Sequence, residues 1–200
     1  MNIFYLDSNY EQAARWHCDE HVRKMMVEYA QLLSTAHRVL DGTPCTVSKW
    51  CYRTKDKQWY INHNYKHYHL DSDHYDHRNI LVPSKCKTYL AAHKNHPSTI
   101  WARTTIGNYH WLWSLLDQLS LEYITRYTKE HKVSYSGLLD RLYCPPRAIS
   151  HAPATPVPQC MPEPYKVKDD PVAAYRQFYV KDKSSFASWK YTFAPSWYNV

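Results

Sequence analysis

Glycine is scarce in this chain, with only three among 200 residues. The sequence contains no Walker loop, no G-x-G-x-x-G motif and no G-x-S-x-G motif. Glycine-rich loops of these kinds bring the backbone close to phosphate groups or expose a nucleophilic serine, so the common nucleotide-binding loops and the hydrolase elbow are excluded. Any phosphate site must therefore be built from side chains and helix ends.

Paired cysteines are also absent, because the six cysteines are scattered without a single C-x-x-C motif. This spacing excludes a structural zinc site of the usual type, and we expect reduced thiols. We expect neither a metal nor a cofactor.

Long apolar runs are missing as well. No window approaches the roughly 18 uncharged apolar residues that a membrane-spanning helix needs. The N-terminal residues lack the basic and then apolar layout of a secretion signal. We therefore expect a cytoplasmic protein that does not associate with membranes.

Aromatic residues are abundant, with eight tryptophans and nineteen tyrosines, and the formal charge is +7. Large aromatic faces fill cores, but they also stack on bases and sugars. A basic chain favours an anionic partner. The composition therefore points to DNA or a nucleotide as the partner, and it leaves the oligomeric state open, a homo-oligomer included.

The hydrophobic periodicity predicts a mainly α fold, organised as a single helical domain over residues 1–200. A capping-box pattern starts a helix over about 9–40. A second helical pattern covers about 97–130 with a break near Gly107, and shorter helices are expected at 136–142 and 171–181. Three segments lie outside these helices: a polar, irregular His- and Tyr-rich insertion at 41–84, in which a short helix near 58–69 is one option, a proline-rich strap at 145–164 that lies extended, and an aromatic C-terminal tail at 186–198.

The first predicted helix carries two stripes. The apolar stripe contains Cys18, Val22, Met25, Tyr29, Leu32, Leu33 and Ala36. Beside it, His17, His21, Lys24 and Glu28 fall within an arc of roughly 60°. At the border of a core, burial and neighbouring charges move a pKa towards neutrality, which suits a reactive cleft. The alternative is a solvated face on which Lys24 and Glu28 form an ordinary i,i+4 ion pair.

Distance limits the first of these alternatives. With a rise of about 1.5 Å per residue, His17 and Glu28 are separated by roughly 16 Å along the helix axis, too far to act on one atom. His21, Lys24 and Glu28 span about 10 Å, which suits a ligand the size of a nucleotide. We therefore predict that these three residues carry any catalysis and that His17 binds the ligand.

A second candidate site precedes the helix predicted over 97–130. His93, Lys94 and His96 lie near its N-terminus, and Arg103 is nearby in the sequence. Unpaired backbone N–H groups and basic side chains together bind anions, so we expect His93, His96 and Arg103 to contact a phosphate. Asn108 and Trp111 could extend this site. The alternative is a capped turn whose side chains only satisfy backbone donors.

Two further segments allow more than one interpretation. The insertion mixes histidines and aspartates, and His63 and His67 are spaced i,i+4, but polar loops collect such residues without binding metal. The C-terminal tail interleaves aromatic residues with lysine, so Trp189 and Lys190 are candidate contacts to a base or a nucleic-acid backbone. The same tail could instead be a hydrophobic strap that closes the core.

Several segments together resemble a family of largely uncharacterised bacteriophage proteins. They are HCDEHVRKM at 17–25, AQLLSTAHRVL at 30–40, HKNHPS at 93–98, NYHWL at 108–112, AYR at 174–176 and FASWKY at 186–191. The resemblance covers most of the chain except the His-rich insertion. More remotely, it extends to the small helical pyrimidine-dimer DNA glycosylases, which carry an early helix with His and Glu and an aromatic, lysine-containing C-terminal segment near the DNA.

The glycosylase resemblance implies attack on a sugar by an α-amino group that is exposed when Met is removed. Here residue 2 is Asn, which does not favour that removal. Lys24 would have to replace the amine, with Glu28 as the acid or base.

Three hypotheses follow for the function. The first is a phage protein of the infected host cell that recognises DNA or a nucleotide in a basic, aromatic cleft and acts on an N-glycosidic bond. The second is a non-catalytic protein that sequesters a nucleotide signal of host defence. The third is a structural or host-takeover factor whose His and Trp residues serve packing.

Overall fold

The computed structural model describes residues 2–198 and contains helices, strands and two short 3-10 turns. The α-helices are α1 (Tyr10–Trp16), α2 (Asp19–Asp41), α3 (Pro97–Ala102), α4 (Ile106–Tyr127), α5 (Lys132–Tyr135), α6 (Leu138–Arg141) and α7 (Pro171–Asp182). The strands are β1 (Thr43–Arg53), β2 (Gln58–His69) and β3 (Ile80–Leu81), and the 3-10 turns are η1 (Pro83–Lys85) and η2 (Glu163–Tyr165).

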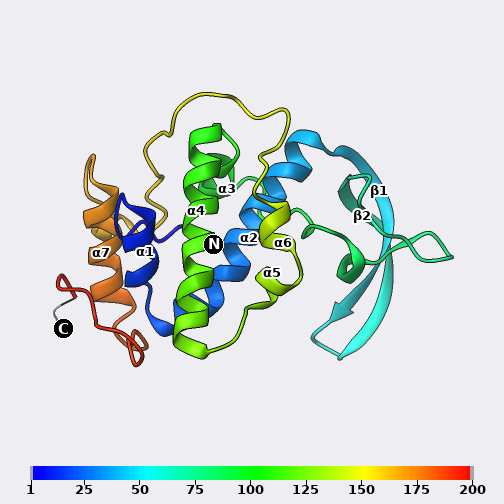
Figure 1. Cartoon of the computed structure of the whole chain (residues 1–200). Coiled ribbons are helices and arrows are strands. Elements are labelled where there is room, and N and C mark those ends of the chain that lie inside the picture. The colour runs from blue at the N-terminus through cyan, green and yellow to red at the C-terminus, as the bar shows by residue number, and fades with distance from the viewer. Residues whose placement is uncertain (1, 199–200) are drawn as a thin grey trace.

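The expectation of a mainly α fold is wrong, because a three-stranded sheet accompanies the helices. Helices hold 43% of the residues and strands 14%, so the fold is mixed α/β with helices dominant. The strand order is β2-β1-β3, with β1 and β2 antiparallel and β3 parallel to β1. Figure 1 shows the sheet beyond one end of α2, while α1 and α7 lie at the opposite side of the molecule.

The apolar stripe predicted for the first helix is confirmed. All seven of its members are buried, with at most 1% of any of them exposed: Cys18, Val22, Met25, Tyr29, Leu32, Leu33 and Ala36. They belong to one core with the leucines of α4, and α4 also packs against α1. Each fully buried leucine or tyrosine stabilises the fold by about 1.5 to 3 kcal/mol relative to its exposed form, so α2 is the central helix of the body.

The single helix predicted over 9–40 is divided in two, which corrects that expectation. The first part begins as predicted, because the Asn9 side chain accepts a hydrogen bond from the backbone N–H of Gln12. The chain then leaves helical geometry at His17 and Cys18, both of which have extended backbone angles. His17 therefore does not share a helix with the other three residues of the titratable stripe.

The break expected near Gly107 is confirmed by the gap between α3 and α4. A Cβ on Gly107 would lie 2.2 Å from the backbone nitrogen of Ala154. Only glycine allows the proline-rich strap to pass this close to α4. No helix or strand element lies between α6 and η2 in the described chain, as the extended strap predicts, and α7 matches the helix expected over 171–181.

The insertion at 41–84 is an ordered arm, which corrects the expectation of an irregular segment. The residues 58–69, considered above as a short helix, form β2 and pair with β1 over most of its length. No residue of the insertion belongs to the buried hydrophobic core cluster of the described chain. The sequence signal was weak because aromatic and polar side chains occupy both faces of the hairpin, so no clear apolar alternation appears.

A buried polar cluster fastens this arm to α2. The guanidinium of Arg38 donates to both carboxylate oxygens of Asp73, at 2.7 and 3.0 Å, and also to backbone carbonyls of Tyr68, Thr88 and Tyr89. His67 Nε2 donates to Asp73 Oδ2 over 2.7 Å. Burial opposes the charge of Asp73, but the hydrogen bonds from His67 and Arg38 lower the pKa of its carboxyl well below the ordinary value.

Candidate functional site

The turn between α1 and α2 positions the candidate site, and Arg126 of α4 holds this turn in place. The buried guanidinium of Arg126 donates to the backbone carbonyls of Arg15 and His17, at 2.9 and 2.8 Å. It also pairs with Asp19 at 3.1 Å and with Glu122 at 2.9 Å. The carbonyls at the end of α1 lack helical partners, so a buried cation satisfies them and fixes the start of α2.

His17 is part of the core and not of a ligand site. Its Nδ1 donates to the Ala13 carbonyl at 2.7 Å, and its Nε2 accepts from the Tyr29 hydroxyl at 2.8 Å. The same hydroxyl accepts from the backbone N–H of Phe4. Burial lowers the pKa of His17 to about 4, so the ring is neutral near pH 7. The residue contributes a satisfied internal hydrogen bond and does not reach solvent.

His21 lies between the core and the surface. Its ring stacks on Phe4, with centroids 4.2 Å apart, and meets Phe186 edge-on at 5.4 Å. Its Nδ1 lies 2.5 Å from the hydroxyl of Tyr179, which also accepts from the backbone N–H of Cys18. Burial, with the positive charges of Lys183 and Lys24 nearby and His17 adjacent, lowers the pKa of His21 to about 2.

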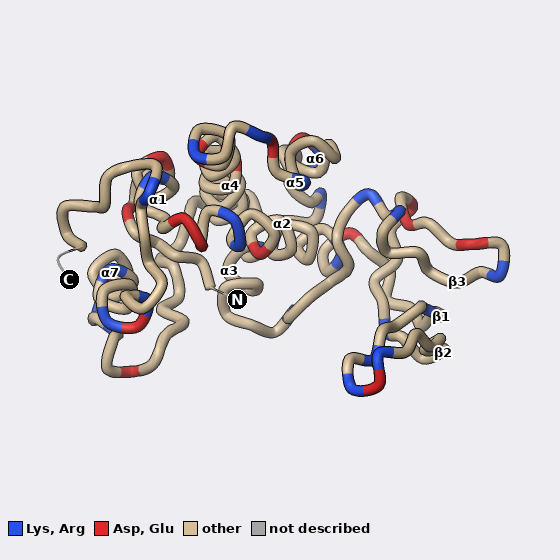
Figure 2. The backbone as a smooth tube through the Cα atoms, turned by 90° about the horizontal axis from the view of Figure 1, so that it is seen from below, with Lys and Arg blue, Asp and Glu red and all other residues tan. Residues whose placement is uncertain are grey.

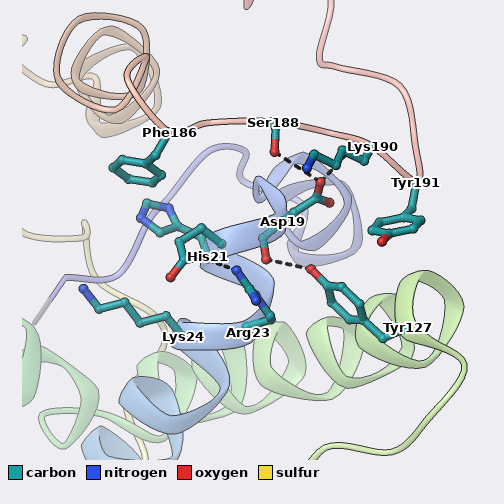
Figure 3. Close-up of a pocket in the computed structure, with 10 residues that line it drawn as sticks. Asp19, His21, Arg23, Lys24, Tyr127, Phe186, Ser188, Lys190 and Tyr191 are labelled. Carbon is teal, nitrogen blue, oxygen red and sulfur yellow. Dashed lines mark hydrogen bonds and ion pairs between the residues drawn. The ribbon is translucent and has the colours of Figure 1, made fainter.

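A cleft of about 540 Å³ opens over His21. One wall is the first turns of α2, the second is the end of α4, and the third is the segment that follows α7. Its lining residues are Asp19, Glu20, His21, Arg23, Lys24, Tyr127, Phe186, Ser188, Lys190 and Tyr191. Figure 3 shows Phe186, His21 and Lys24 gathered on one side of the cleft and Tyr127, Tyr191 and Lys190 on the other.

Asp19 joins the three walls. Its carboxylate accepts from the backbone N–H of Lys190 at 2.8 Å and from the hydroxyl of Ser188 at 3.4 Å, while its backbone N–H donates to the Ser188 carbonyl. Its backbone carbonyl accepts from the Tyr127 hydroxyl at 2.9 Å. With Arg126 also bound, this carboxylate is fully engaged in structure. Asp19 therefore holds the C-terminal segment in register with α2.

The cations of the cleft differ in their engagement. Arg23 forms an exposed ion pair with Glu20. Lys24 lies 3.7 Å from Glu28, and 61% of its side chain is exposed. Lys190 is exposed, and within residues 2–198 the structure gives its ammonium group no ion pair. The ammonium groups of Lys24 and Lys190 are therefore the charges best placed to meet an anion.

The structure brings together two of the three predicted catalytic residues. His21 and Lys24 line the cleft, but Glu28 does not, although it stays within ion-pair distance of Lys24. Glu28 lies one turn further along α2, and 19% of its side chain is exposed.

The three residues of the predicted anion site near α3 have different surroundings. His96 caps α3, because its Nδ1 accepts from the backbone N–H of Ser98 at 3.2 Å. This is the capped-turn alternative. His93 lies on another surface depression, beside Lys94 and Tyr68. Burial lowers the pKa of Arg103, whose Nη1 is buried without a hydrogen-bond partner.

Asn108 and Trp111 serve packing. The amide of Asn108 donates to the Trp101 carbonyl and the Thr155 hydroxyl, each at 2.9 Å, and accepts from the Thr155 backbone N–H at 2.7 Å. These bonds tie α4 to the proline-rich strap. Trp111 donates to the Ser8 carbonyl at 2.9 Å and packs on Tyr5. Neither side chain is available to a ligand at the cleft.

The C-terminal tail packs on the body at one residue and lines the cleft at the next. Trp189 packs on Tyr198 with ring centroids 4.6 Å apart, and its indole N–H is buried without a partner, so it acts as a hydrophobic strap. Lys190 lines the cleft. The contact of the tail with a base or a nucleic-acid backbone stays a prediction.

Sequence reasoning missed seven residues of the cleft: Asp19, Glu20, Arg23, Tyr127, Phe186, Ser188 and Tyr191. Phe186 and Tyr191 lie in the aromatic tail, from which Trp189 and Lys190 were predicted as contacts instead. Asp19 and Tyr127 gave no signal, because an acidic residue in the first turn of a helix and an aromatic residue in its last turn are common.

The described residues also show whether the chain offers a metal site or a membrane-spanning helix. No group of three or more His, Cys, Asp or Glu side chains within residues 2–198 is placed to hold a metal ion. In the same part of the chain, no helix has the length and apolar character needed to cross a membrane.

Comparison of the chain with protein-family models, with curated proteins and with solved structures finds no match in any of the three. The functional argument therefore depends on the site itself.

Proposed function

We propose that the cleft captures a nucleotide, either free or at an exposed position in DNA, and holds it without cleaving it. The observation that carries this proposal is the presence of an aromatic ring and a cation on each side of the cleft. Phe186 and Lys24 line one side, and Tyr191 and Lys190 line the other.

The dimensions and the exposed aromatic rings fit such a ligand. A volume of about 540 Å³ lies in the usual range for small-molecule sites, about 300 to 1,000 Å³. Phe186 is 42% exposed and Tyr191 is 59% exposed, although both belong to a segment that otherwise packs on the body. Exposed aromatic faces beside a cavity provide stacking surfaces for a base.

The charges of the cleft suit a phosphate group more than a neutral ligand. Lys24 and Lys190 present ammonium groups, whereas the nearby carboxylates of Asp19 and Glu20 are engaged with Arg126 and Arg23. An anion bound between the lysines would gain charge-assisted hydrogen bonds, and it would compete with Glu28 for the ammonium group of Lys24. A phosphate is therefore the anionic group that we assign to this end of the ligand.

Capture is better supported than cleavage by the protonation states around the cleft. A general acid or base works best when its pKa lies near the operating pH. The pKa of His21 is lowered to about 2, and its ring is held by Tyr179, so it is a neutral wall of the site. Glu28 does not line the cleft. The glycosylase-like alternative therefore lacks a positioned acid or base.

Retention without turnover matches the second hypothesis drawn from the sequence, in which a phage protein sequesters a nucleotide signal of host defence. That hypothesis needs only complementarity to the ligand, which the cleft offers.

The test is a titration of the protein with AMP, TMP and ADP, followed by tryptophan fluorescence. We expect Phe186→Ala and Lys190→Ala each to weaken binding by about fivefold or more, since a stacked base or a charge-assisted hydrogen bond contributes about 1 to 3 kcal/mol. Phe193→Ala is the matched control, because Phe193 lies in the same segment, is 94% exposed and does not line the cleft. Lys168→Ala is the control for the lysine.

Product analysis in the same experiment separates capture from catalysis. Release of free base from DNA or from a nucleotide would overturn capture in favour of the glycosylase-like alternative. Equal affinities for all four variants and the parent would remove the cleft as the binding site.

A further inference from the structure

The outward face of the arm carries a second set of aromatic and basic side chains, far from the cleft. In the antiparallel register, Trp50 pairs with Ile61 and Tyr52 pairs with Trp59, so these four side chains share one face of the hairpin. The rings of Tyr52 and Trp59 lie 5.2 Å apart and tilted by 53°, near the tip. Figure 2 shows the strands standing apart from the helices.

The same face continues towards the body with cations. Lys66 and Tyr68 follow on β2, and Lys94 donates to the Tyr68 hydroxyl at 2.8 Å. Near the middle of the arm, the guanidinium of Arg78 lies 5.7 Å from the ring centre of Trp50. Arg78 also pairs with Asp76, which leaves half of its own side chain exposed. Aromatic and basic groups therefore occur along the face from the base of the arm to its tip.

Packing does not account for these side chains. Trp59 is 66% exposed and Tyr52 is 47% exposed, and the arm contributes nothing to the buried hydrophobic core cluster. Large aromatic residues with exposed faces cost solubility and favour association, so their clustering on one face of a protruding hairpin indicates a partner surface.

The charge of the β1–β2 hairpin indicates the chemistry of that partner. Residues 43–69 contain five Lys or Arg residues and one Asp, a net charge of +4, compared with +7 for the whole chain. The whole arm, 41–84, has a net charge of +1, because its remaining residues add four Asp and one Arg. The single acid, Asp56, is paired with Arg53 in the turn at the tip. A short hairpin that concentrates more than half of the net positive charge beside exposed rings is complementary to a polyanion that offers flat apolar groups.

We propose that this face binds single-stranded nucleic acid, with bases on Trp59, Tyr52 and Trp50 and phosphates near Lys66, Arg78 and Lys94. Bases in a duplex are stacked on one another, so only a single strand presents the faces that these rings need. Trp50 and Tyr52 alternate on β1 and so lie about 7 Å apart, which places separate bases on these two rings, while Trp59 extends the surface beside Tyr52. This site does not depend on nucleotide capture by the cleft.

The test is binding of fluorescein-labelled oligothymidylate and oligouridylate, compared with a labelled duplex of the same length, by fluorescence anisotropy. We expect the single strands to bind more tightly than the duplex, with affinity that falls as salt increases. Trp59→Ala should weaken binding by about fivefold or more through lost stacking, and Lys66→Glu should weaken it and reduce the salt dependence.

Matched controls keep the result specific to the arm. Tyr135→Ala removes an aromatic ring of the same exposure, 65%, from α5, and Lys168→Glu reverses a charge elsewhere. Neither control should change the affinity. Phe186→Ala should weaken the titrations with AMP, TMP and ADP, while Trp59→Ala should leave them unchanged, so failure of one site is distinguishable from failure of the other.

Three outcomes would overturn the proposal: oligonucleotide affinity that Trp59→Ala and Lys66→Glu leave unchanged, preference for the duplex over both single strands, or no oligonucleotide binding together with arm-dependent dimers in sedimentation. The last outcome would assign the exposed edge of β2 to pairing with a second copy of the chain.

Discussion

The helical body and the arm achieve order by different means. In the body, α2 and α4 bury apolar side chains on a continuous core, and the buried ring of His17 has both of its nitrogens hydrogen-bonded. The arm buries little, and the Arg38–Asp73 pair fastens it to α2. Burial of apolar area stabilises the body through many small contributions, whereas the arm depends on a few strong and directional ones.

The difference teaches where each region is vulnerable. A core distributes its free energy over many contacts, so the loss of one weakens it without abolishing it. Replacing one partner of a buried ion pair strongly destabilises the fold, because the remaining charge stays buried with neither a counter-charge nor water around it. The stability of the arm should therefore depend strongly on the residues that attach it to α2. The stability of the body should depend on the protonation of its buried histidines.

The largest expected effect follows from Arg38→Met. Asp73 would remain buried without its guanidinium partner, so we expect the free energy of unfolding to fall by about 3 to 5 kcal/mol. Urea denaturation measures the loss. Amide hydrogen exchange should accelerate in β1 and β2 before it accelerates in α4, since the arm loses its attachment first.

Arg53→Met is the matched control for this change, because Arg53 and Asp56 form an exposed pair on the same arm. Its expected effect is about 0 to 1 kcal/mol. Leu116→Ala in the core should destabilise by about 2 to 5 kcal/mol and accelerate exchange in the helices instead. Equal acceleration of exchange in arm and body after Arg38→Met would contradict the separation drawn here.

An intermediate effect is expected from mild acid, and it should reach the body before the arm. The pKa values of His17 and His21 are lowered from 6.5 to about 4 and about 2, so the unfolded chain takes up protons that the folded chain refuses. The contribution of these histidines to the free energy of unfolding is complete above pH 6.5, and it decreases as the pH falls towards the two lowered pKa values. At pH 5 we expect each histidine to lower the free energy of unfolding by about 2 kcal/mol. Urea denaturation at pH 7 and at pH 5 measures this difference.

The attachment of the arm should resist this change. The pKa of Asp73 is lowered, so its contribution is present above the ordinary carboxyl value of 3.8 and is lost only below it. His17→Gln should flatten the decline between pH 6.5 and pH 4, whereas His110→Gln, at an exposed position, should not. A decline that His17→Gln leaves unchanged would assign the acid sensitivity to other groups.

The smallest expected effect concerns Glu28. Glu28→Gln removes the partially exposed pair with Lys24, and the loss of this pair should lower stability by no more than about 0.5 kcal/mol. The released Lys24 should then bind phosphate more strongly, and titration with ADP should show a modest gain in affinity. A loss of product formation with unchanged affinity would instead show that Glu28 acts as a catalytic acid or base.

The elements predicted correctly from the sequence are those with a clear local signal, such as apolar side chains gathered on one face. The apolar stripe of α2, the start of α7 at Pro171 and the break near Gly107 all follow from periodicity, proline and glycine. The hairpin was missed because neither of its faces is buried as a whole. Trp50 and Tyr52 lie on one face and alternate along the strand with Cys51 and Arg53 on the other. Strand prediction depends on one buried face, which the arm lacks.

The candidate site was predictable only on its helical side. His21 and Lys24 share a helix, so their proximity follows from a spacing of three residues. The partners Phe186 and Lys190 arrive from the opposite end of the described chain, and no local pattern fixes that docking. The break at His17 and Cys18 depends on Arg126, which binds the exposed carbonyls from α4. Such long-range contacts lie outside what local periodicity encodes.

The bond between Asp19 and the backbone of Lys190 spans 171 positions of the chain, and this separation has a consequence for synthesis. The ribosome releases residues 19–24 early, and α2 can begin to form while the rest of the chain is still being made. The cleft lacks its third wall until residues 186–191 have emerged and docked on Asp19. A ribosome-bound chain that ends before residue 186 would therefore hold helical structure but no complete cleft, so the proposed capture of a nucleotide requires synthesis to have passed residue 191.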